Sequence, residues 1–106
     1  MAWIFLCVAG ILEIFWAISL KYTEGFSNIS WSVVTIIGMT ASFYFLAQAL
    51  ETIPVGTAYA VWTGIGAAGT AILGIILFSE SAALARIACI GLIVAGIIGL
   101  KFTSSS

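Results

Sequence analysis

The sequence contains very little charge. Of its 106 residues only 7% are charged: four are acidic, three are basic and none is histidine. A soluble domain of this length needs more charge for its surface, and without a basic run there is no sign of nucleic-acid binding. Cys7 and Cys89 lie inside apolar stretches, where we expect small hydrophobic side chains. With 63% hydrophobic residues, the composition is typical of a membrane protein, and we expect no enzyme, no cofactor and no metal.

Four long apolar runs dominate the chain, and short polar links separate them. A helix of about 20 apolar residues crosses the ~30 Å hydrocarbon core of a bilayer. The sequence therefore predicts an all-α, polytopic membrane protein in one domain, residues 1–106, with transmembrane helices over residues 2–20, 31–50, 55–78 and 82–100. The first run is not preceded by basic residues, so we expect a retained helix rather than a signal peptide.

Three features mark the ends of these runs. Gly25 is expected to stop the first helix, and Pro54 fits the first turn of the third. Residues 102–106 are expected to form a frayed tail.

Glu13 lies near the middle of the first apolar run. An ionisable side chain at this depth costs about 2.5–3.5 kcal/mol by insertion scales, so it persists only with a partner or a function. The three cations, Lys21, Arg86 and Lys101, lie near the ends of apolar runs, where their side chains reach water. The partner of Glu13 is therefore expected from outside the chain: a proton, a cationic ligand or a second copy of the protein. A ligand and a proton that compete for one acid meet the minimum requirement for antiport.

Several aromatic and hydroxyl side chains are candidates to line a site around Glu13. The N–H group of Trp16 and the O–H group of Tyr59 can orient a carboxylate, and aromatic faces attract cations by about 0.5–2 kcal/mol. A carboxylate can grip a planar guanidinium through two hydrogen bonds. Trp62 lies too deep for the membrane interface, and Ser42 lies on the more polar side of the second run. For all four, a purely structural role within the protein is the alternative.

Small residues are concentrated in the last two runs. Gly64 and Gly66 form a local weak point in the third run, where we predict a bend or hinge unless they serve packing alone. Gly91, Ala95 and Gly99 recur every four residues, which predicts a helix-packing or dimer face.

Positive charges are almost evenly divided between the two faces of the membrane. Four spans with short links place Lys101 and the terminal amine on one face, and Lys21 and Arg86 on the other. So small a difference gives the positive-inside rule little to act on, so insertion in both orientations is an open possibility. Two oppositely oriented copies would then supply an inverted repeat between them.

Three segments of the chain resemble one known family. They are Gly10 to Ala17 (GILEIFWA), Pro54 to Ala67 (PVGTAYAVWTGIGA) and Gly96 to Lys101 (GIIGLK). They are similar to the small multidrug resistance family, and most of all to its guanidinium exporter branch. Trp16 and Met39 favour this branch, because the multidrug branch usually has glycine and tyrosine at these positions.

The resemblance implies an antiparallel, dual-topology homodimer in the bacterial inner membrane that exports guanidinium in exchange for protons. It implies that Glu13 is the shared site of substrate and proton. The other roles that it implies are a substrate-site lining of Trp16, Ser42, Tyr59 and Trp62, a hinge at Gly64 and Gly66, and a dimer contact at Gly91, Ala95 and Gly99.

The sequence leaves three other functions open. The nearest is export of substituted guanidinium, quaternary ammonium or other hydrophobic cations, because Phe43, Tyr44 and Phe45 make the second run strongly aromatic. A rotary ATPase proteolipid also carries one membrane carboxylate, but late in a glycine-rich helix rather than in the first of four. A non-transporting scaffold subunit would have no need of Glu13.

Overall fold

The computed structural model describes residues 1–103, which form four α-helices joined by short links. The helices are α1 (Ala2–Tyr22), α2 (Ile29–Ala49), α3 (Val55–Phe78) and α4 (Leu84–Thr103). All four are long and apolar enough to cross a membrane. The protein is therefore an all-helical, multi-pass membrane protein, as the sequence predicts.

Side-chain caps move the facing ends of α1 and α2 outward from the expected spans. α1 continues past Leu20 to Tyr22, and the Thr23 hydroxyl closes it by donating a 2.7 Å hydrogen bond to the Leu20 carbonyl. α2 begins before Trp31, because the Asn28 side chain accepts a 3.1 Å hydrogen bond from the Trp31 N–H group.

Two expectations about helix ends are wrong. Gly25, with φ 73°, lies inside the α1–α2 link rather than at the end of α1, because Thr23 already caps that helix. Phe102 and Thr103 were expected in the tail but belong to the last turn of α4. Residues 104–106 of the expected tail lie outside the described residues.

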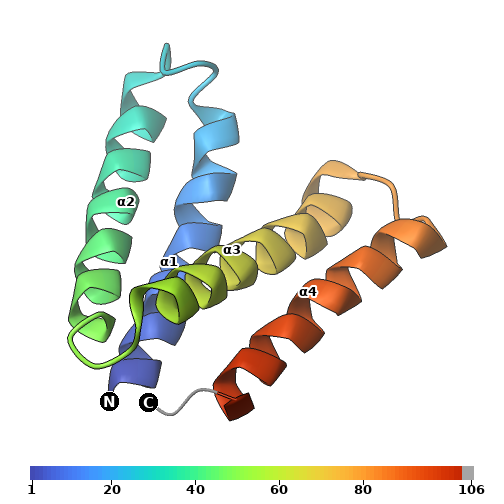
Figure 1. Ribbon diagram of the computed structural model, residues 1–106. Coiled ribbons are helices and arrows are strands. Elements are labelled where there is room, and N and C mark those ends of the chain that lie inside the picture. Colours follow the sequence, from blue (N-terminus) through green and yellow to red (C-terminus); the bar gives the residue numbers. More distant parts are fainter. Residues whose placement is uncertain (104–106) are drawn as a thin grey trace.

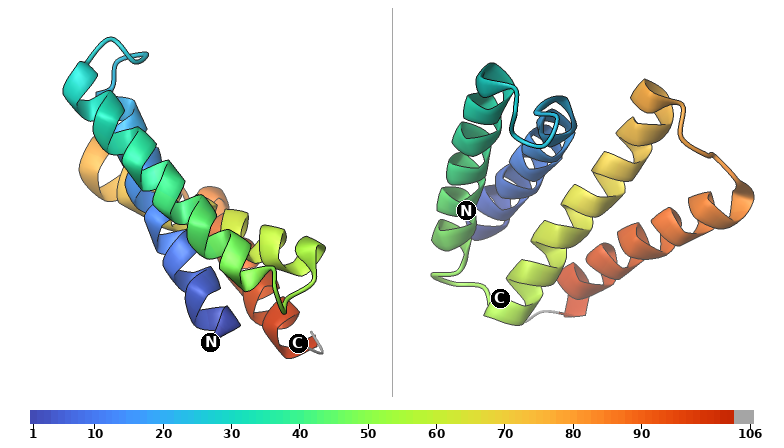
Figure 2. Two further views of the ribbon diagram at one scale, coloured as in Figure 1. Left: turned by 90° about the vertical axis from the view of Figure 1, so that its left-hand side faces the viewer. Right: turned by 90° about the horizontal axis from the view of Figure 1, so that it is seen from above.

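The four helices form a thin, open arrangement. α1 packs against both α2 and α3, while α4 packs mainly along α3 (Figure 1). The Cα atoms extend over 43 × 34 × 17 Å, so the shortest dimension is less than two helix diameters of about 10–12 Å each. Figure 2 shows how far α4 stands from α1 and α2 at the end formed by the α3–α4 link.

The buried core lies where α1, α2 and α3 meet. Its largest members are Leu6, Ile53 and Trp62, the last only 6% exposed. The two faces of α1 and α2 are also joined by a buried 2.9 Å hydrogen bond between the hydroxyls of Ser19 and Thr35. Such interhelical hydroxyl bonds stabilise membrane helices where no water is available. α1 is thereby packed against other helices on two sides.

Candidate functional site

Glu13 projects from α1 toward a point of α3 that has no side chain. A Cβ atom built on Gly66 would collide with the Glu13 carboxylate. One turn away along the same crossing, a Cβ atom on Gly10 would lie 2.7 Å from Cγ2 of Ile65. Glycines on both helices therefore allow α1 and α3 to approach closely, and the carboxyl group of Glu13 lies against the bare backbone of α3.

An open groove begins at this carboxylate. Glu13 and Ala17 of α1 form one wall, and α3 forms the opposite wall with Thr63, Gly66 and Thr70 among its residues. The remaining members of the groove are Ala67, Ala71, Glu80 and Arg86. The groove thus combines one acid at membrane depth with small and hydroxyl side chains.

Three buried polar atoms at or near the groove have no hydrogen-bond partner within residues 1–103. They are Oε1 of Glu13, Nε1 of Trp16 and Oγ1 of Thr70. The expected hydrogen bond from the Trp16 indole to Glu13 is therefore not formed within a single chain. A buried acceptor without a partner costs free energy that a bound proton, a cation or a group from another chain recovers.

The three cations are engaged elsewhere. Arg86 donates a 2.7 Å hydrogen bond to Glu80. Lys101 lies 4.9 Å from the ring centroid of Trp3, and Lys21 lies 5.1 Å from that of Phe78. Within the described part of the chain, no basic side chain forms an ion pair with Glu13, so its charge is left for an external partner.

The aromatic candidates form a continuous row. Trp16 contacts Phe43 with ring centroids 6.5 Å apart, Phe43 contacts Trp62 at 5.5 Å, and Trp62 contacts Tyr59 at 5.5 Å. All three pairs are edge-on, an arrangement that aromatic rings favour. The structure therefore brings Trp16, Tyr59 and Trp62 together through Phe43, which links α1, α2 and α3.

Ser42 joins the same three helices through one hydroxyl. Its Oγ donates a 2.7 Å hydrogen bond to the Ala9 carbonyl and accepts a 3.0 Å hydrogen bond from Nε1 of Trp62. Ser42 is fully buried. Ala9 precedes Glu13 by one helical turn, so Ser42 fixes Trp62 relative to the part of α1 that carries the acid.

Known proteins are similar to this chain over most of its length. Residues 1–93 match the family described as Small Multidrug Resistance protein. The chain belongs to this family. A guanidinium exporter of Yersinia pseudotuberculosis is 62% identical over 104 residues, which cover 98% of this chain and 100% of the relative. Guanidinium exporters of Salmonella typhimurium and Citrobacter freundii are 58% and 59% identical over 104 residues, with 98% of this chain and 99% of each relative covered.

In this small multidrug resistance protein the two central glycines of α3 face different neighbours. Gly66 faces Glu13, whereas a Cβ atom on Gly64 would lie 3.0 Å from the Ile97 side chain of α4. α3 is one continuous helix across both positions. Gly64 therefore serves close packing of α3 and α4, and the predicted hinge stays a prediction.

The predicted dimer residues lie away from the groove. Gly91, Ala95 and Gly99 are exposed on α4, and nothing lies within 4 Å of a Cβ atom built on either glycine. Ile90 is the only buried residue of α4 within the described chain. This face is free to receive another helix.

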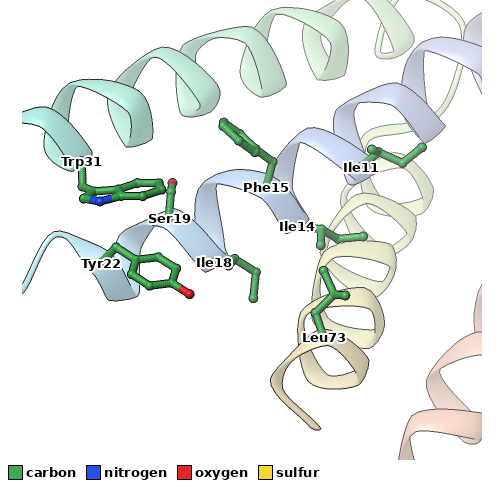
Figure 3. Close-up of a pocket in the computed structure, with 8 residues that line it drawn as sticks. All are labelled: Ile11, Ile14, Phe15, Ile18, Ser19, Tyr22, Trp31 and Leu73. Atoms are coloured by element: carbon green, nitrogen blue, oxygen red, sulfur yellow. The ribbon is translucent and has the colours of Figure 1, made fainter. Parts of the chain in front are cut away.

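A second hollow in this protein is almost entirely apolar. It lies beside α1, and its lining includes Phe15, Ile18, Trp31 of α2 and Leu73 of α3 (Figure 3). Ser19 is its only aliphatic hydroxyl, and its bonds go to Thr35 and to the Trp16 carbonyl. This hollow offers no carboxylate to a cation, so the groove at Glu13 is the better candidate site.

Seven groove residues were not among the predicted site residues: Ala17, Thr63, Ala67, Thr70, Ala71, Glu80 and Arg86. Thr63 and Thr70 follow the steps of three and four residues along α3 that include Gly66, so helical spacing alone could have found them. Glu80 and Arg86 lie in and beyond the α3–α4 link, and nothing in the sequence indicates that the link folds back toward Glu13.

Proposed function

We propose that this protein exports guanidinium in exchange for protons, as an antiparallel homodimer in the bacterial inner membrane. The observation that carries the proposal is the half-buried Glu13, whose Oε1 atom is buried and without a partner at a groove between two membrane helices. The names of the relatives support guanidinium as the cargo.

Glu13 is the common binding site in this proposal. A guanidinium ion places two N–H donors on the two oxygens of a carboxylate, with its charge opposite the negative charge. A proton removes that negative charge and one acceptor. The two cations therefore exclude each other, and each full cycle moves them in opposite directions.

The row of aromatic rings selects a small planar cation. Trp16 and Tyr59 carry an N–H and an O–H donor, while the N–H of Trp62 is donated to Ser42, which holds that ring in place. The indole N–H of Trp16 has no partner and can donate a hydrogen bond to a Glu13 carboxylate of the proposed homodimer. None of these four residues lines the groove at Glu13 within the single chain, so the proposal requires the homodimer to bring the row to the acid.

Two oppositely inserted copies complete the site. The groove of one thin chain is open, and a second copy covers it and adds its own Glu13. The exposed line of Gly91, Ala95 and Gly99 forms the contact between copies. Alternating access then exchanges the roles of the two chains, with Gly64 and Gly66 as the hinge, and the proton gradient sets the direction.

Proteoliposomes test this exchange directly. Vesicles loaded with guanidinium should release it when the external solution is acidified, and Glu13→Gln should stop the release. Glu51→Gln, which removes the same charge from the exposed α2–α3 link, should leave it unchanged. Release that ignores the pH difference would contradict the coupling, and wild-type release by Glu13→Gln would point to a role for the acid outside transport.

Competition separates the substrate classes. Tetraalkylammonium and alkylguanidinium salts, added against labelled guanidinium, should compete more weakly than guanidinium itself. Stronger competition by tetraalkylammonium would instead support a broad exporter of hydrophobic cations, for which the apolar hollow beside α1 offers space. A large ring rather than a dimer in detergent would support the proteolipid alternative.

A further inference from the structure

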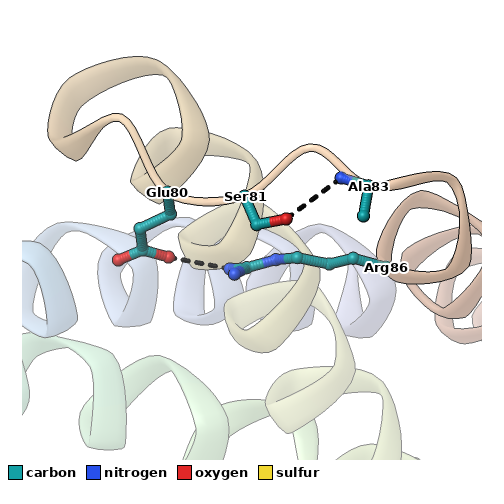
Figure 4. Close-up of polar contacts among 4 residues, drawn as sticks. All are labelled: Glu80, Ser81, Ala83 and Arg86. Atoms are coloured by element: carbon teal, nitrogen blue, oxygen red, sulfur yellow. Dashed lines mark hydrogen bonds and ion pairs between the residues drawn. The ribbon is translucent and has the colours of Figure 1, made fainter.

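A second carboxylate shares the groove with Glu13. Glu80, in the α3–α4 link, accepts a 2.7 Å hydrogen bond from the guanidinium group of Arg86, which lies in the first turn of α4 (Figure 4). Both residues line the same groove as Glu13. The pair therefore stands at one end of the path that leads to the central acid.

The backbone holds the Glu80 side chain in a defined place. Ser79 ends α3 with φ 54°, and the N–H group of Glu80 then donates a 3.3 Å hydrogen bond to the Gly74 carbonyl. A Cβ atom on Gly74 would lie 2.6 Å from Oε1 of Glu80, so the carboxylate lies against bare helix backbone. This turn and this glycine together direct Glu80 into the groove rather than away from the protein.

The group that occupies Glu80 has the chemistry of the proposed cargo. The side chain of arginine ends in a guanidinium, which binds a carboxylate in the same way as free guanidinium does. The side chains of Arg86 and Glu80 are 36% and 41% exposed. Exposed ion pairs contribute little net free energy, so a competing cation can displace Arg86 from Glu80.

We infer that Glu80 is a second guanidinium-binding carboxylate at the mouth of the groove, occupied in the resting protein by the tethered guanidinium of Arg86. This inference rests on the proposed function, since it takes guanidinium as the cargo. A free guanidinium ion replaces Arg86 on Glu80 on its way to or from Glu13. Arg86 then binds Glu80 again and displaces the guanidinium ion, so the ion does not stay bound at the mouth of the groove.

Two variants of the Glu80–Arg86 ion pair distinguish a cargo-binding role from a purely structural role in the α3–α4 link. Arg86→Gln and Glu80→Gln both break the ion pair, but only Arg86→Gln leaves a free carboxylate. If the pair merely ties the link together, the two variants behave alike. If Glu80 binds cargo, they change guanidinium binding in opposite directions.

Equilibrium binding of radiolabelled guanidinium to the full chain in nanodiscs tests the inference. Glu13→Gln serves as the background, because it removes the central site. In that background, adding Arg86→Gln should strengthen binding by about two- to fivefold, the factor that matches loss of an exposed ion pair of up to ~1 kcal/mol. Adding Glu80→Gln as well should abolish this gain, whereas adding Glu24→Gln in the exposed α1–α2 link should preserve it.

Arg86→Lys in the same binding measurement separates the shape of the guanidinium group from its positive charge. It keeps the positive charge but not the planar fork, so it should give a gain smaller than that of Arg86→Gln. Equal binding by the Glu13→Gln variants with and without Arg86→Gln would overturn the inference, as would equal effects of Arg86→Gln and Glu80→Gln. Because these measurements record binding and require no transport, their failure leaves the exchange experiment above unaffected, and the reverse also holds.

Discussion

The side-chain oxygens of Ser42 on α2 and Glu13 on α1 differ in their hydrogen bonding. Oγ of Ser42 has a donor and an acceptor, whereas Oε1 of Glu13 has no partner within the described residues. A paired buried hydroxyl stabilises the fold, and an unpaired buried acceptor favours whatever binds it. Substitution of Ser42 should therefore change stability first, and substitution of Glu13 should change binding first.

Guanidinium binding should weaken as the pH falls. In the proposed exchange a proton and guanidinium compete for Glu13, so the apparent affinity should fall by up to about tenfold per pH unit in the range where free Glu13 is protonated. Titration calorimetry over a pH series measures this slope, and weakly buffered solutions should acidify when guanidinium is added. An affinity that does not change with pH would contradict competition at one carboxylate.

Ser42→Ala should lower the free energy of unfolding by about 1–3 kcal/mol, because it leaves the Trp62 indole N–H and the Ala9 carbonyl without their partner. Thermal unfolding in detergent measures the loss. Thr40→Val is the control: the Thr40 hydroxyl is exposed and bonds only the Ile36 carbonyl of its own helix. Equal losses in both variants would show that the interhelical bonds of Ser42 contribute little.

At the scale of helices, the glycines of α3 separate binding from packing. Gly66→Ala should weaken guanidinium binding, because the new methyl group would occupy the position of the Glu13 carboxylate. Overpacking costs about 1–3 kcal/mol, which corresponds to about 5- to 150-fold in affinity. Gly56→Ala, with nothing within 4 Å of its Cβ atom, should leave affinity unchanged. Unaltered affinity in Gly66→Ala would mean that Glu13 moves away from α3 when it binds.

α4 should determine assembly rather than folding. Gly91→Leu should weaken dimerisation without destabilising the single chain, since nothing in the described chain lies within 4 Å of the new Cβ atom. Gly96→Leu is the matched control, because that Cβ atom is equally free but lies off the line of Gly91, Ala95 and Gly99. Energy transfer between labelled chains in liposomes measures dimerisation. Equal dimerisation in the two variants would place the contact elsewhere.

The helices could be predicted from the sequence because the length of an apolar run is itself the physical requirement for crossing a bilayer. Helix ends were predicted less well, since caps such as Thr23 and Asn28 depend on turns that hydropathy does not encode. Glu13 could be selected as a candidate because an acid at membrane depth is costly, and its role stays a prediction. The position of Glu80 could not be predicted, because it depends on how the α3–α4 link folds back on Gly74.

At the scale of the whole molecule, charge placement bears on orientation. The N-terminus and the last turn of α4 lie at one end, and the α1–α2 and α3–α4 links lie at the other (Figure 1). Lys101 is therefore near one membrane face, while Lys21 and Arg86 are near the opposite face. A few added cations should be enough to fix the orientation of every copy.

Ser27→Lys with Ser30→Arg should hold the α1–α2 link on the cytoplasmic side, and Glu51→Lys with Thr52→Arg should hold the opposite end there. Each variant alone should fail to protect cells against guanidinium, because only one orientation is present. Expression of both together should restore protection. Full protection by one variant alone would contradict the antiparallel pair.

The 17 Å depth of the chain also links export to gene expression. A slab this thin cannot insulate a cation from lipid by itself, so in the proposed homodimer a lone copy should be inactive and transport should require two copies. Below the density at which most copies have met, doubling the expression level should raise guanidinium tolerance by about fourfold rather than twofold. A cell with little of this protein would thus have almost no protection against guanidinium, and a modest rise in expression would increase that protection steeply.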